Sequence, residues 1–291
     1  MHQAQQLAVD FQDRALDATG RSVDEIADAC RGLMDESHIC FVRNFPLDAD
    51  AFLAFLDAFG TPLANYSSRS DLEKTDPHPQ INRVKYKRRE ETTKQSVHYV
   101  AGGLRPHSAR SWYSPRPRYF SMLMIEPGWR DTPPGERGES LVLSWHAMFD
   151  ELAERDGDAF EEHFARLSET PITFQANNVR ETLCDLPLLY PLDDAAGPYD
   201  VGVRLKQDLG EKILGIRDQI PDFPRYQQSL QYLLDASNEE RFQTVFSMDS
   251  GDLVLVDNNR FAHGRCGIVG ERLVDGRVET NNRELWSVTV E

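Results

Sequence analysis

The chain has 291 residues, enough for one large domain or two smaller ones, and its 40% hydrophobic content is enough for a buried core. Its 48 acidic and 32 basic residues give a formal net charge of −16, which argues against nucleic acids and anionic membranes as partners. No apolar run approaches the roughly 20 residues of a membrane span, and the N-terminus lacks the apolar segment of a secretion signal. The four cysteines form no CxxC pair, which favours reduced thiols. We therefore expect a cytoplasmic protein without a membrane partner.

The N-terminal part of the sequence, about residues 1–60, is mainly helical in pattern. A first helix is predicted over about residues 4–18, and a serine cap followed by acidic residues predicts a second over Ser22–Asp35. A short strand is predicted over Ile39–Val42, followed by an amphipathic helix over Leu47–Phe59. We expect this helical part to pack against the rest of the chain.

Beyond residue 80, short apolar runs predict strands, with helices only between some of them. The predicted strands are Ile81–Tyr86, Ser96–Val100, Tyr119–Ile125, Ser140–Leu143, Pro171–Gln175, Val201–Leu205, Leu253–Val256 and Leu285–Val290, and the predicted helices are Trp145–Arg155, Asp158–Leu167 and about Pro224–Ala236. Strands and helices do not alternate as in βαβ units. The pattern therefore indicates an α+β fold around an antiparallel barrel or double sheet, with residues 1–291 forming a single domain.

The segment from Gly251 to Gly264 carries the most informative motif. A Gly-Asp turn opens the apolar run Leu253–Val256, which suits a strand buried on both faces, and polar residues follow up to His263. A sheet can hold such groups rigidly, as a reactive site requires. The residues Asp257–Asn259 either orient His263 or satisfy backbone groups at the end of the strand.

A second polar cluster surrounds His107. In an extended segment residues i and i+2 face the same way, so His107 and position 109 can address one point. If His263 reaches that point from its distant strand, two imidazoles can share a metal ion. Two histidines and one carboxylate form the open-sided site of non-haem Fe(II) oxygenases. Here position 109 is Ala109, which cannot ligate.

The order of these motifs resembles the Fe(II)/2-oxoglutarate-dependent oxygenases of the taurine dioxygenase and clavaminate synthase group. The likeness lies in PHSxxSWxxxRPRYFSM, GES, GDLVLVDNNRFAHGR and RELW, and it spans roughly Ile39 to Val290. It implies a distorted double-stranded β-helix, related to the jelly roll, with buttressing helices. It also implies an oxidoreductase that uses Fe(II), 2-oxoglutarate and O2 to functionalise a C–H bond of a small metabolite, such as a free or carrier-bound amino acid.

The same resemblance assigns roles to individual residues. His107 and His263 match the two histidine ligands of the iron. Arg283 matches the arginine that pairs with the distal carboxylate of 2-oxoglutarate, for which a guanidinium fork is well suited. The interval between His263 and Arg283 is longer than is usual in the family, so Arg277 is the alternative.

Three further residues are candidates on weaker grounds. Ser140, in Gly138-Glu139-Ser140, stands where the family tends to place a hydroxyl that binds the same carboxylate. Arg265 lies two residues after His263 and faces the same side of an extended strand, so it is a candidate for holding substrate or co-substrate. Trp112 follows the first motif and either lines the substrate pocket or packs in the core.

Ala109 departs from the family, which has Asp or Glu at this position. One explanation is halogenation, in which chloride fills the space left by the carboxylate and the product carries chlorine instead of hydroxyl. A second is that alanine replaces the acidic ligand of an ordinary hydroxylase or desaturase. A third is a jelly-roll binding protein without catalysis. The sequence leaves the first two open, while the intact histidines and Arg283 argue against the third.

Overall fold

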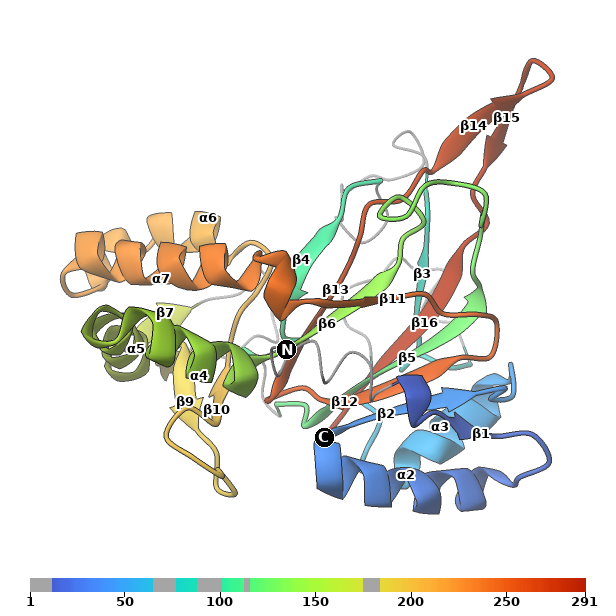
Figure 1. Ribbon diagram of the computed structural model, residues 1–291, viewed down its shortest axis with the longest axis horizontal. Coiled ribbons are helices and arrows are strands. Elements are labelled where there is room, and N and C mark those ends of the chain that lie inside the picture. Colours follow the sequence, from blue (N-terminus) through green and yellow to red (C-terminus); the bar gives the residue numbers. More distant parts are fainter. Residues whose placement is uncertain (1–11, 65–76, 88–100, 113–115, 175–183) are drawn as a thin grey trace.

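The computed structural model describes residues 12–64, 77–87, 101–112, 116–174 and 184–291. Two antiparallel sheets form its centre, with one group of helices against the larger sheet and another group beside the smaller sheet (Figure 1). No helix in the described part of the chain is long and apolar enough to cross a membrane. This arrangement confirms the α+β double-sheet architecture expected from the sequence.

The larger sheet contains six strands in the order β1-β2-β12-β5-β16-β3. Their bounds are β1 Leu16–Asp17, β2 Ile39–Arg43, β3 Asn82–Lys85, β5 Tyr119–Glu126, β12 Leu253–Asp257 and β16 Glu284–Val290. All neighbours are antiparallel except β1 and β2. Every residue of β12 is buried, as its continuous apolar run predicts.

The smaller sheet has the order β11-β6-β13-β4, and all its pairs are antiparallel. Its strands are β4 Leu104–His107, β6 Ser140–Ser144, β11 Thr244–Phe246 and β13 Phe261–Arg265. One buried apolar cluster contains side chains from both sheets, including Phe120 and Val254 from the larger and Val142 and Phe261 from the smaller. The two sheets therefore enclose a common interior, as in a double-stranded β-helix.

Two helices, α2 (Val23–Ser37) and α3 (Ala49–Asp57), cover the outer face of the larger sheet. Ser22 and Glu25 form a reciprocal capping box that starts α2, which explains the boundary predicted from the sequence. The apolar faces of α2 and α3 share a buried cluster with Leu123, Leu253 and other strand residues.

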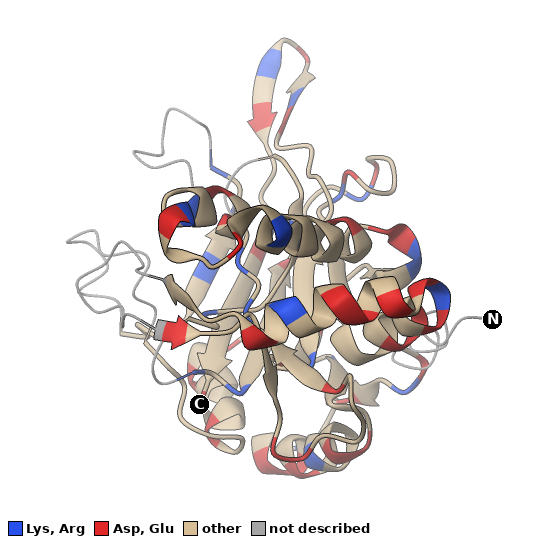
Figure 2. Cartoon of the chain, turned by 90° about the vertical axis from the view of Figure 1, so that its left-hand side faces the viewer, with Lys and Arg blue, Asp and Glu red and all other residues tan. Residues whose placement is uncertain are grey.

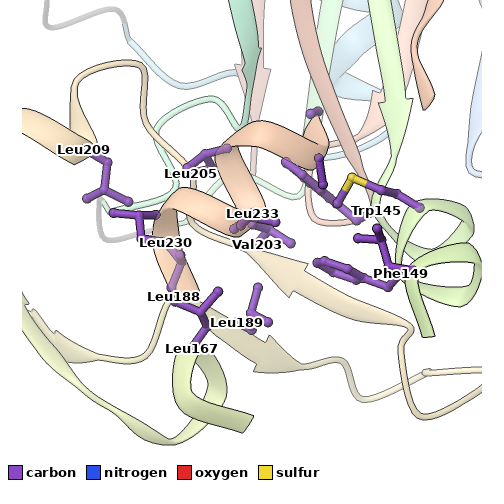
Figure 3. Close-up of a cluster of buried hydrophobic side chains, with 14 of the residues drawn as sticks. Trp145, Phe149, Leu167, Leu188, Leu189, Val203, Leu205, Leu209, Leu230 and Leu233 are labelled. Atoms are coloured by element: carbon purple, nitrogen blue, oxygen red, sulfur yellow. The ribbon is translucent and has the colours of Figure 1, made fainter. Parts of the chain in front are cut away.

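The second helical layer lies beside the smaller sheet. It consists of α4 Trp145–Asp156, α5 Asp158–Glu169, α6 Leu209–Leu214, α7 Phe223–Ser237, the short 3-10 helices η3 Arg217–Gln219 and η4 Glu240–Phe242, and the paired strands β7 Ile172–Phe174, β8 Cys184–Leu186, β9 Leu189–Pro191 and β10 Val201–Val203. Its buried leucines and aromatic side chains form a core of their own (Figure 3). Acidic residues outnumber basic ones along α4 and α5, which face the viewer in Figure 2.

A hairpin of β14 (Glu271–Val274) and β15 (Arg277–Thr280) projects from the body of the molecule (Figure 1). Its Asp275-Gly276 turn has positive φ at both residues, which matches the right-handed twist of the strands. At its base the Asn281 N–H donates to the Gly270 carbonyl over 2.8 Å. The hairpin accounts for the long interval between His263 and Arg283.

The structure confirms most of the predicted elements and corrects others. The predicted helix over residues 4–18 is wrong at its end, because Leu16–Asp17 forms a strand beside β2, while residues 1–11 lie outside the described residues. The predicted strand Ser96–Val100 also lies outside them. Strands β8, β9, β11, β14 and β15 and helix α6 were not predicted from the sequence.

Candidate active site

His107 and His263 meet on neighbouring strands of the smaller sheet. His107 ends β4, His263 lies in the middle of β13, and the strand register places the two residues directly opposite each other. Their ring centroids are 4.3 Å apart, and each residue is only 7% exposed. The structure thus brings together two imidazoles that lie far apart in the sequence.

The orientation of His107 is set through its Nδ1 atom. Nδ1 lies 2.9 Å from the carbonyl oxygen of Arg105, which can only accept a hydrogen bond. The ring is held through Nδ1, and Nε2 is the nitrogen through which a metal ion would be bound. The amide nitrogen of Gln207 also lies 2.8 Å from Nδ1. Gln207 follows β10, and nothing in the sequence pattern had pointed to it.

The orientation of His263 is set by stacking. The ring of Phe120, from β5 of the larger sheet, lies parallel to the imidazole, with centroids 3.7 Å apart and an interplanar angle of 18°. His263 is therefore held between Phe120 on one side and His107 on the other. Both sheets contribute to fixing the histidine pair, and the stacking of Phe120 on His263 was not predicted.

Position 109 provides backbone groups and a methyl group. The N–H of Ala109 donates to Asn258 Oδ1 over 2.8 Å, and Asn258 Nδ2 donates to the Ala109 carbonyl over 2.9 Å. Within the described ranges no group of three or more His, Cys, Asp or Glu residues is placed to hold a metal ion. Two imidazoles can therefore supply two ligands to a first-row metal ion, and the side chain of Ala109 supplies none.

Arg283 is buried immediately before β16. Its backbone N–H donates to Asn281 Oδ1, and its side chain passes Gly138, where an added Cβ would lie 3.1 Å from the arginine Cδ and Nε. Burial, together with the nearby charges of Arg265 and Arg130, lowers the pKa of Arg283 to about 9, against the effect of Glu139. Among the described residues no carboxylate forms an ion pair with Arg283, so the guanidinium fits a carboxylate ligand.

Ser140 and Arg265 lie opposite each other on β6 and β13. The Ser140 hydroxyl is buried and donates to Met248 Sδ over 3.4 Å, a weak hydrogen bond that a better acceptor can replace. Arg265 donates to the carbonyl oxygens of Gly102 and Cys266 over 2.7 and 3.3 Å. Burial lowers the pKa of Arg265 to about 10. These residues and Arg283 form a buried cationic region in an acidic protein.

Two candidates from the sequence lie elsewhere. Arg277 begins the exposed strand β15, directly beside the turn of the projecting hairpin, so it does not share the buried region of Arg283. Trp112 is buried in the core of the second helical layer, and its Nε1 donates to the carbonyl of Arg204 over 2.7 Å. Arg277 therefore lies on the surface, and Trp112 packs in the core, which is one of the two roles considered for it.

A buried ion cluster lies just before His263. Arg260 contacts Asp194, Asp200 and Asp257 with N–O distances of 2.8, 3.1 and 3.3 Å. Burial alone would lower the pKa of Arg260, but its three carboxylate neighbours outweigh this effect and raise the pKa. The cluster anchors the polar segment between β12 and β13 to the loop before β10.

The two-sheet fold has a jelly-roll arrangement, and it buries the histidine pair. The sequence model described as "Taurine catabolism dioxygenase TauD, TfdA family" matches residues 3–289. The chain therefore belongs to this family of Fe(II)/2-oxoglutarate-dependent dioxygenases. A comparison with curated proteins finds no match.

Solved structures share the fold at low sequence identity. An asparagine oxygenase in complex with Fe(II), 2S,3S-3-hydroxyasparagine and succinate matches with a TM-score of 0.61 and 15% identity over 92% of this chain and 79% of that chain. The non-heme iron oxygenase OrfP in complex with Fe and alpha-ketoglutaric acid matches with 0.57 and 14% over 92% and 79%. A taurine dioxygenase from Burkholderia xenovorans matches with 0.55 and 15% over 94% and 83%.

Proposed function

We propose that this protein binds Fe(II) and 2-oxoglutarate and oxidises a C–H bond of a small molecule, an amino acid or a close derivative. The observation that carries the proposal is the buried pair His107 and His263, with ring centroids 4.3 Å apart in a TauD-family fold. The substrate class is supported by the asparagine oxygenase, whose structure contains a hydroxylated amino acid and succinate.

Each residue of the site has a defined part in this function. His107, through Nε2, and His263 hold the iron, while Arg283 and the Ser140 hydroxyl bind the distal carboxylate of 2-oxoglutarate. The apolar cluster around Phe120 excludes water from the reacting centre. Iron, 2-oxoglutarate and O2 supply the oxidation of an unactivated C–H bond, with succinate and CO2 as co-products.

Position 109 favours halogenation as a second candidate outcome. The protein supplies a methyl group here, and Asn258 engages both backbone groups of Ala109, so an anion from solution is the third ligand in this candidate reaction. Chloride would restore the missing negative charge. In this case R–H, 2-oxoglutarate, O2, Cl⁻ and H⁺ give R–Cl, succinate, CO2 and H2O. Without chloride, the outcome is hydroxylation or desaturation.

Anaerobic titration with Fe(II) and 2-oxoglutarate tests the proposed function. We expect a weak visible charge-transfer band, and succinate formation once air is admitted. If neither the band nor succinate is observed, the protein is a binding module that has kept the fold without the chemistry. His263→Ala is the matched control, because it removes one of the two imidazoles.

Chloride distinguishes the two outcomes. For a halogenase, we expect added chloride to shift the charge-transfer band of the wild-type protein, and we expect Ala109→Glu to abolish the shift by filling the position. If chloride does not shift the band of the wild-type protein and Ala109→Glu hydroxylates the substrate, halogenation is ruled out. The same protein would then be a hydroxylase that lacks its acidic ligand.

A further inference from the structure

Asn258 connects the end of β12 to the segment that follows His107. Its side-chain oxygen accepts the N–H of Ala109, and its amide nitrogen donates to the carbonyl of the same residue, over 2.8 and 2.9 Å. The amide nitrogen also lies 3.3 Å from the Pro117 carbonyl, and the backbone N–H of Asn258 donates to the Arg118 carbonyl. Asn258 is 1% exposed, so water does not compete for these bonds.

The two bonds to Ala109 fix the peptide groups on both sides of one Cα atom. Rotation about either backbone torsion of Ala109 would break one of them, so the direction of its Cβ is set by Asn258. The chain turns sharply at the next residue, Arg110, which has φ +50 in the left-handed region. The Arg110 side chain is held by the Ala64 carbonyl and the Thr289 hydroxyl. The turn is therefore fixed from both sides.

We propose that Asn258 is the positioning residue for the third coordination position of the metal site. The inference rests on the proposed iron site, in which position 109 stands beside His107. By engaging both backbone groups of Ala109, Asn258 fixes the direction of its Cβ, and we expect a carboxylate placed there to reach the open position. Ala109→Glu should therefore regain a working ligand without rearrangement of the backbone.

Asn259 provides a matched comparison. It is the same residue type at the adjacent position, it is also buried, and its side chain accepts a hydrogen bond from the Tyr190 hydroxyl over 2.7 Å. Its side chain thus holds the β9–β10 region and not position 109. A purely structural role for this polar segment predicts similar consequences for changes at either asparagine.

The test combines changes at positions 109 and 258 and measures equilibrium Co(II) affinity without turnover. Asn258→Asp keeps the acceptor for the Ala109 N–H but loses the donor to its carbonyl. In the Ala109→Glu background we expect this change to weaken Co(II) binding by about tenfold or more, since partners that orient a ligand typically contribute about 10–100-fold. In the wild-type background, which has no ligand at 109, the loss should stay below about threefold. Asn259→Asp should act equally in both backgrounds.

The outcomes separate the inference from the function on which it rests. Equal losses from Asn258→Asp in both backgrounds would overturn the positioning role while leaving the iron site intact. Absence of Co(II) binding in every variant, including the wild type, would overturn the iron site and the inference with it. If Asn258→Asp does not fold, Asn258→Ala is compared in the same way. In Asn258→Ala, which loses the acceptor for the Ala109 N–H, hydrogen exchange at the Ala109 amide should accelerate more than at the amides of β4, and this provides a second readout on metal-free protein.

Discussion

Two buried arginines in this molecule have opposite surroundings. Arg260 and Arg283 are 5% and 4% exposed, and both flank residues of the proposed active site. Arg260 is surrounded by the carboxylates of Asp194, Asp200 and Asp257, which raise its pKa. Arg283 has no ion-pair partner among the described residues, and burial lowers its pKa to about 9. A buried arginine that is paired with carboxylates of the protein stabilises the fold. A buried arginine without such an ion pair is suited to bind an anionic ligand.

The largest expected effect comes from Arg260→Met. Removing the guanidinium leaves Asp200 and Asp257 buried without their partner, so the free energy of unfolding should fall by about 3–5 kcal/mol. Urea denaturation measures this loss. The control is Arg272→Met, which breaks exposed ion pairs with Asp131 and Glu279 and should leave the midpoint nearly unchanged. Equal stability of the two variants would contradict the scaffold role of Arg260.

Arg283→Met should show the reverse pattern. Stability should stay equal or increase, because the change removes a buried cation without a partner. Affinity for 2-oxoglutarate should fall by about 100-fold or more, since a bidentate charged pair is lost. Calorimetric titration of the Co(II)-loaded protein, together with urea denaturation, checks both parts. A loss of stability as large as that of Arg260→Met, with co-substrate affinity unchanged, would reverse the proposed roles.

In Arg283→Lys the cation of this site is a lysine, which can lose its proton within the pH range in which the protein can be studied. Burial lowers the pKa of a lysine from about 10.4, and an anion binds only to the protonated form. Affinity for 2-oxoglutarate should therefore be highest at low pH and fall by about tenfold for each pH unit above that pKa. The wild-type affinity should fall only once the pH passes the Arg283 pKa of about 9. Calorimetric titrations at a series of pH values measure the two profiles, and parallel profiles would contradict a direct role for the cation.

The smallest effect is expected for Arg277→Ala. Arg277 lies on the exposed hairpin, so its loss should change affinity for 2-oxoglutarate by less than about twofold and leave stability almost unaltered. The same titration checks this expectation. A large loss of affinity would return Arg277 to the co-substrate site.

The sequence was sufficient to predict the fold class and to single out the histidine pair. The apolar run of β12 and the motifs around His107 and His263 have local signatures that survive in a single sequence. Gln207 and Phe120 reach the pair from other elements through tertiary packing, and neither contact was predicted, although Phe120 lies within the motif RPRYFSM. Residues that orient the site from distant segments of the chain therefore could not be predicted from the sequence alone.

Two points that the sequence left open have specific physical causes. The ambiguity between Arg277 and Arg283 arose because the hairpin was not recognised, although Asp275-Gly276 between apolar residues is a strong hairpin signal. The sequence left two roles open for Asn258, orienting His263 or satisfying backbone groups. Its side chain satisfies the backbone of Ala109, which lies far away in the chain. Such a partner becomes visible only when the two segments are placed side by side.

The hydrogen bond between Asn281 and Gly270 has a consequence for how this protein can change. Because the chain leaves and re-enters the body at two residues already joined to each other, the hairpin between them is an appendage of adjustable length. We expect that the hairpin can be shortened, exchanged or extended with a grafted peptide without a change in the position of Arg283 relative to His263. Counting residues from histidine to arginine is accordingly a poor guide to relatedness among proteins of this kind.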